Sequence, residues 1–248
     1  MRWIRKTTTT ALTALALAVA ALPGSASAQE VPDAAEQQIL DSAGFLAAHP
    51  DLENRGRGWA AYNRGEHAEA MTYFRRGARY ADKPSQGMVA EMIWKGEGAP
   101  RDPALAYAWM DLAAERGYEG FTILRERYWQ ALDAAQREEA IEKGQAVYAE
   151  FGDAVAQPRI AAVLRRARRQ MTGSRVGMSG NLRIEIAGPG GISQSIDGSK
   201  YYAEKFWEPE AYQAWHDAVW KKPLVGRVDV GDVEPVRAPT DRNDDKER

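Results

Sequence analysis

The chain of 248 residues contains no cysteine, which excludes disulfide bonds, thiolate metal ligands and a lipid-bearing cysteine after a leader. Histidine is also scarce, with His49, His67 and His216 as its only members. No two of them have the spacing of metal ligands on one helix, so a zinc site has little support. The sequence therefore predicts neither a metal nor a cofactor.

Motifs of covalent hydrolases are missing as well. Neither Gly-x-Ser-x-Gly nor Ser-x-x-Lys occurs in the chain. The glycines at 188–191 lack the Lys-Ser/Thr pair and the helix start of a phosphate-binding loop, and they indicate a turn instead. No catalytic residue is predicted from these patterns.

Long apolar runs are confined to the first 28 residues. A basic start precedes the apolar run 11–22, which is too short to span a bilayer and ends at small residues 26–28. This pattern predicts a secretory signal peptide cleaved after Ala28, and a periplasmic or secreted protein with no membrane span after cleavage.

An excess of positive charge is absent too. Three of the 33 basic residues lie in residues 1–28, so the remaining 30 face 35 acidic residues, a net charge of −5. This balance argues against a nucleic-acid partner.

The most informative stretch runs from Gly96 to Gly117. Gly96 and Gly98 tolerate positive φ, which ends one helix and forms a loop. Asp102 followed by Pro103 predicts the start of a second helix, with an N-cap acceptor and proline at the first helical position. The small residues Ala113 and Ala114 on that helix would let a neighbouring helix approach closely, and the Trp109 indole would fill the space that they leave.

These residues resemble the Sel1-like repeat, a helix-loop-helix unit of the tetratricopeptide class. Ala99 departs from the family pattern, which has valine there. The resemblance implies stacked helix pairs with a curved surface that binds a protein partner, since such proteins mostly mediate assembly. The matching positions are Gly96, Gly98, Asp102, Ala106, Trp109, Ala113, Ala114 and Gly117.

An internal repeat supports this interpretation. A shift of 36 residues puts Ala70 on Ala106 and Tyr73 on Trp109. The helix-ending glycines Gly65 and Gly96 differ by only 31, because the first unit lacks the loop that follows Gly96.

The predicted fold is mainly α: a helical repeat array followed by a small α+β C-terminal module. Within the array, Asp133 with Gln136 predicts a helix start, and Pro158 is expected to open a further helix. In the module, two short strands should precede a hairpin turn at 197–198, and a helix should begin at 208–209. Its core is thin, so docking on the array is expected.

The predicted segments are signal peptide 1–28, N-terminal polar segment 29–50, repeats 51–171, module 172–236 and disordered tail 237–248.

Three functions from different classes follow. The first is a non-enzymatic periplasmic scaffold that binds a protein partner through the repeats. The second is a cell-wall or glycan-binding module that uses the aromatic cluster Tyr201, Tyr202, Trp207, Tyr212, Trp215 and Trp220. The third is a glycoside hydrolase that uses two facing carboxylates of the same module, drawn from Glu204, Glu208, Glu210 and Asp217.

Overall fold

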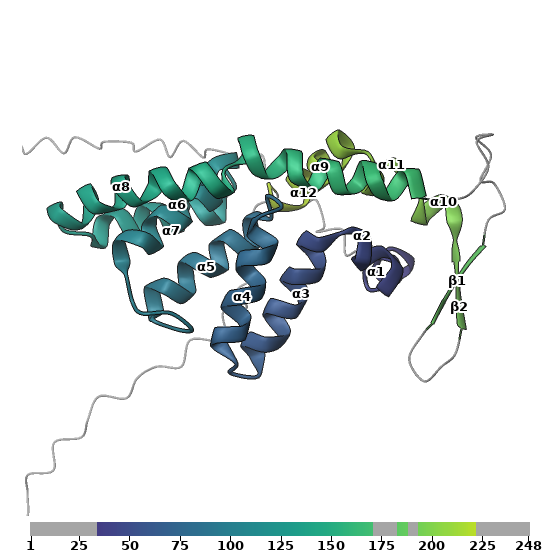
Figure 1. Ribbon diagram of the computed structural model, residues 1–248, viewed down its shortest axis with the longest axis horizontal. Helices are drawn as coiled ribbons and strands as arrows, with labels where there is room; N and C mark the ends of the chain where they lie inside the picture. The colour runs from purple at the N-terminus through teal and green to yellow at the C-terminus, as the bar shows by residue number, and fades with distance from the viewer. Residues whose placement is uncertain (1–33, 171–182, 188–192, 222–248) are drawn as a thin grey trace, which may run out of the picture. The chain divides into compact units, whose positions relative to one another are not determined.

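Helices make up most of the computed structural model, which describes residues 34–170, 183–187 and 193–221 (Figure 1). All of these residues belong to one compact unit. The predicted signal peptide, the turn at 188–191 and the tail 237–248 lie outside the described residues.

Two helix pairs form the centre of the array. Helix α3 (Pro50–Asn63) packs on α4 (His67–Ala78), α4 packs on α5 (Lys83–Lys95), and α5 packs on α6 (Pro103–Ala113). Their small residues allow close contact: a Cβ added at Gly58 would lie 2.7 Å from the ring of Phe74. The mainly helical prediction is confirmed.

The third unit departs from this pairing. A short 3₁₀ turn η1 (Ala114–Arg116) leads into α7 (Glu119–Ala131), and α8 (Ala134–Phe151) packs chiefly on α6. Asp133 and Gln136 form the predicted capping box at the start of α8.

Helix α9 (Asp153–Gln170) begins earlier than the sequence predicts. Pro158 lies inside α9, so the expectation that it opens the helix is wrong. The fixed φ of proline is helical, and α9 continues through Pro158 without the one backbone N–H that proline cannot donate.

The C-terminal module contains β1 (Arg183–Ala187) and β2 (Ser193–Asp197), which pair antiparallel with Ile184 opposite Ile196. Three helices follow: α10 (Gly198–Tyr201), α11 (Glu204–Trp207) and α12 (Pro209–Trp220). The hairpin turn expected at 197–198 is wrong, because Asp197 caps α10 by accepting the backbone N–H of Ser199 at 2.8 Å.

Two N-terminal helices complete the core of this module. The polar segment 29–50, where a short helical patch is expected around Ile39, Leu40 and Leu46, contains two helices, α1 (Ala34–Leu40) and α2 (Ala43–Ala48). Ile39 and Phe45 are buried in one cluster with Phe206 and Trp207. The thin core of the module is therefore supplemented from the other end of the chain.

Candidate interaction groove

The loop between α5 and α6 depends on two glycines in the left-handed region. Gly96 caps α5 with φ +79°, and Gly98 has φ +73°. A Cβ at Gly98 would lie 2.3 Å from the carbonyl oxygen of His67, so the loop lies against the start of α4. Tyr62 also donates a hydrogen bond of 2.8 Å to Glu97 of this loop.

Asp102 is the N-cap of α6 and accepts the backbone N–H of Leu105 at 2.9 Å. Its other carboxylate oxygen pairs with Lys143 of α8. These contacts hold the pKa of Asp102 below its usual range although burial opposes them. One side chain thus starts α6 and ties α8 to it.

Four of the five remaining motif residues lie in the core, and the fifth, Gly117, is exposed. Trp109 is 1% exposed, and its ring lies 4.6 Å from that of Phe151. Gly117 follows the 3₁₀ turn with φ +69°. Ala106, Ala113 and Ala114 are also buried. These four buried side chains therefore build the helix packing.

Helix α12 contacts the array through polar and aromatic pairs. The Tyr212 hydroxyl donates to Asp51 of α3 at 2.6 Å, although 161 residues separate them. The Tyr118 hydroxyl donates to Asp217 at 2.6 Å. Trp220 stacks on Phe121, with ring centroids 6.0 Å apart. The expected docking of the module is thus present among the described residues.

Burial shifts the pKa values of three side chains at this interface. It raises the pKa of Asp51, and it raises the pKa of Tyr212 well above its ordinary value, where the Asp51 carboxylate adds to the effect. It also lowers the pKa of His216 well below its ordinary value, with Arg55 and Arg116 contributing. Neither Asp51, Tyr212 nor His216 lines a hollow described below, so a substrate has no path to them there.

A second set of buried charges connects α5, η1 and α9. Lys83 is 1% exposed and lies 2.6 Å from Glu115 and 3.1 Å from Asp153. Arg116 pairs with Asp153 at 2.7 Å. Every cation in this set has an anionic partner, which is the condition for charges to be stable inside a protein.

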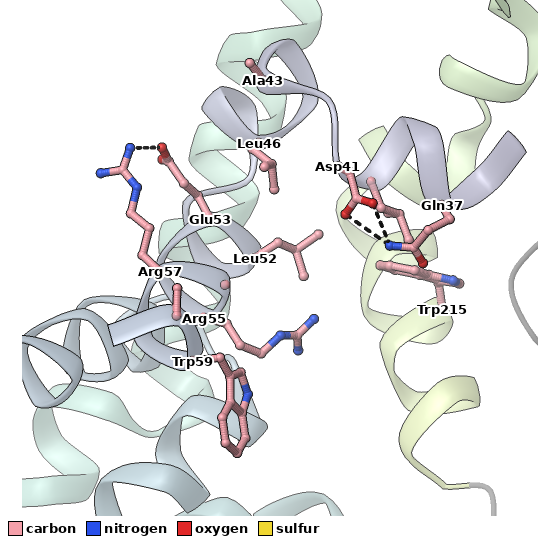
Figure 2. Close-up of a pocket in the computed structure, with 13 residues that line it drawn as sticks. Gln37, Asp41, Ala43, Leu46, Leu52, Glu53, Arg55, Arg57, Trp59 and Trp215 are labelled. Carbon is pink, nitrogen blue, oxygen red and sulfur yellow. Dashed lines mark hydrogen bonds and ion pairs between the residues drawn. The ribbon is translucent and has the colours of Figure 1, made fainter. Parts of the chain in front are cut away.

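An open hollow lies where α1, α2 and α3 meet α12, and we call it the Trp215 hollow. Its volume is about 670 Å³. Its wall includes Leu46 and Leu52 beside Arg55, Trp59 and Trp215. Figure 2 shows Leu52 and Arg55 extending from α3 toward the side on which Trp215 lies, whereas the Glu53–Arg57 pair projects from the other side of α3.

A second hollow of about 320 Å³ adjoins it, and we call it the Trp220 hollow. Arg55 and Trp59 line both hollows. The other wall residues come from α5, α6, α7 and α12 and include Met88, Phe121 and Trp220. We call the two hollows together the groove.

The structure divides the six residues of the predicted aromatic cluster into three groups. Tyr201, Trp207 and Tyr212 are buried at 9%, 4% and 1% exposure, so they form core rather than a platform. Tyr202 is 37% exposed. Trp215 and Trp220 are partly buried and line the groove.

Two of the four carboxylates proposed for hydrolysis have partners of their own. Glu208 pairs with Arg168 of α9, and Asp217 accepts the Tyr118 hydroxyl. Glu204 and Glu210 are exposed. Across the residues for which positions are given, no group of acidic or histidine side chains could hold a metal ion.

The sequence interpretation did not select Arg55, Trp59 or Phe121. Arg55 and Trp59 are four positions apart on α3, which places them on one helix face. That spacing was the available signal, but it does not distinguish a groove from a core.

In the portion of the chain that the structure describes, no helix combines the length and apolar character needed to cross a membrane.

The chain matches no protein-family model and no curated protein. Among solved structures, it is similar to a protective antigen present in uropathogenic Escherichia coli strains, described as displaying an SLR (Sel1-like repeat) fold. The identity is 21% and the TM-score 0.40. The match covers 54% of this chain and 28% of the antigen, so the chain spans little more than a quarter of the antigen's length.

Proposed function

We propose that the protein is a non-enzymatic scaffold of the Sel1-like class that binds a segment of a partner protein in the groove. The observation that carries this proposal is Trp59, which is 41% exposed at the junction of the two hollows. An exposed indole in a hollow is the type of residue that contributes most to protein binding. The loop at 96–102 and the cap at Asp102 support the Sel1-like assignment.

The partner segment should present apolar side chains, because Leu46, Leu52, Met88 and Phe121 form much of the groove wall. Arg55 already pairs with Asp82 at 2.8 Å, so it contributes little free charge to a ligand. Apolar contact should therefore contribute more to binding than the charge of Arg55 does.

A site-specific crosslinking experiment tests the proposal. A photoreactive amino acid replaces Trp59 in one full-length protein and Ile141 in another. Ile141 of α8 is 61% exposed and lines neither hollow, so it serves as the matched control. We expect a defined crosslinked partner at position 59 only, and competition by unlabelled protein but not by its Trp59→Ala variant. Equal crosslinking at both positions would contradict the proposal.

We also propose that the mature protein begins at Gln29 and lies in the periplasm. The apolar run and the small residues before Gln29 support this location. Cell fractionation with N-terminal sequencing tests it. A protein that retains Met1 in the cytoplasmic fraction would exclude export.

A further inference from the structure

The contact face of α12 has the form of a helix laid in a groove. Tyr212, His216 and Trp220 are spaced by four residues and so lie on one face of the helix, which we call the α12 stripe. Tyr212 and Trp220 contact different parts of the array, at Asp51 and Phe121. Anchors at this spacing are typical of helices that bind in grooves.

The opposite surface, which we call the α12 seat, comes from several helices of the array. It comprises Asp51 and Arg55 of α3, Arg116 of η1, and Tyr118 and Phe121 at the start of α7. It is continuous with the groove, because Arg55 and Phe121 line the Trp220 hollow and Trp220 forms part of the same wall. The seat and the groove therefore form one surface.

The interface also contains buried polar atoms that lack partners. Asp51 is 2% exposed and His216 is 7% exposed. Asp51 Oδ1 and His216 Nε2 each make no hydrogen bond, and His216 Nε2 lies 3.7 Å from the other Asp51 oxygen. Unpaired buried atoms destabilise the docked helix, and undocking would return both to water. Among the described residues, α6 and α5 each have one such atom, Trp109 Nε1 and Gln86 Oε1, whereas the contact between Asp51 and His216 brings two together.

We propose that the α12 seat is a helix-binding surface, that α12 is its intrachain ligand, and that the partner segment is a helix with the same stripe, which replaces α12 and the parts of the groove wall that Trp215 and Trp220 form. This inference rests on the proposed scaffold function. The recognition chemistry follows from the contacts. A partner helix needs a hydrogen-bond donor for Asp51, a carboxylate five residues later for Tyr118, and an aromatic ring three residues after that for Phe121.

A labelled peptide with the sequence of residues 208–221 tests the proposal by fluorescence anisotropy on the full-length protein. In the wild type, α12 occupies the seat and the peptide binds weakly. The double variant Asp217→Asn with Trp220→Ala weakens the intrachain helix and leaves the seat unchanged. We expect it to bind the peptide at least tenfold more tightly than wild type. Equal affinity in the two folded proteins would overturn the proposal.

A second peptide carrying Asp217→Ala examines the specific contact. It should bind the double variant at least fivefold more weakly than the first peptide. The two peptides should bind equally once Tyr118→Phe is added to the double variant. A loss of affinity that does not depend on Tyr118 would show that the contact seen for α12 is not used by a ligand helix.

If the double variant does not fold, amide hydrogen exchange of the wild-type protein tests the proposal instead. Amides of α12 should exchange at least tenfold faster than those of α5, because α12 opens without unfolding the array. Equal protection would make α12 an integral part of the fold. If α12 and α5 are equally protected but a partner still crosslinks at position 59, the proposed scaffold function holds and the proposed role of α12 fails.

Discussion

Replacing Gly98 by alanine tests how the loop between α5 and α6 is held. Two penalties combine at this position. A non-glycine residue at φ +73° is disfavoured by roughly 1–2 kcal/mol. The new Cβ would also lie 2.3 Å from His67 O and 2.7 Å from His67 C, and overpacking of this kind costs about 1–3 kcal/mol. The expected loss of unfolding free energy is therefore about 2–5 kcal/mol.

Gly65 provides a matched control on the same chain. Its φ is +78°, but a Cβ there would have no atom within 4 Å. Gly65→Ala should therefore cost only the conformational part, about 1–2 kcal/mol. Because both substitutions also restrict the unfolded chain in the same way, that contribution cancels in the difference.

Urea denaturation of the wild type and both variants measures the difference directly. We expect Gly98→Ala to be less stable than Gly65→Ala by about 1–3 kcal/mol, with unchanged m-values. In thermal melts this corresponds to about 2–4 °C for each kcal/mol. If the two variants agree within about 0.5 kcal/mol, the loop is not held against α4 and the reasoning fails.

Three further predictions concern the core and the buried charges. Trp109→Ala should lower the unfolding free energy by roughly 3–5 kcal/mol, and a near-wild-type urea midpoint would contradict its burial. Tyr118→Phe and Asp217→Ala should be non-additive by roughly 0.5–3 kcal/mol in a double-mutant cycle, whereas simple additivity would mean that their hydrogen bond does not contribute. Arg116 and Lys83 hold the pKa of Asp153 below its usual value although burial opposes them. The ionised Asp153 carboxylate contributes its full stabilisation above about pH 4, its pKa in the unfolded chain. This contribution to the free energy of unfolding is lost as the pH falls through the lower pKa that Asp153 has in the folded protein. The stability difference between wild type and Asp153→Asn should therefore narrow from pH 5 to pH 3, and a constant difference would refute the linkage.

Local contacts explain which parts of the fold were predictable. Gly96 ends α5, Asp102 starts α6, and Asp133 with Gln136 starts α8, as the sequence predicts. Each of these features depends on atoms only a few residues apart. The errors at Pro158 and at residues 197–198 arose where a residue type suits two local structures, and the surrounding packing selected between them.

The groove was not predictable in this way. Trp59 and Trp215 belong to helices far apart in the sequence, and they line one hollow only after α12 docks on the array. Aromatic residues at helical spacing suit a core and a binding surface equally well. Tyr212 is buried in the core and Trp215 lines the Trp215 hollow, because different helices lie opposite the two side chains.

The sequence by itself determined the end of α5, the starts of α6 and α8, and the loop between α5 and α6, because caps and glycines act on neighbours along the chain. Tertiary structure alone decided that α1 and α2 complete the C-terminal module and that α12 rests on α3 and α7. The physical reason is that burial, ion pairing and hydrogen bonding between distant residues leave no local pattern. They depend on which surfaces meet after the chain has folded.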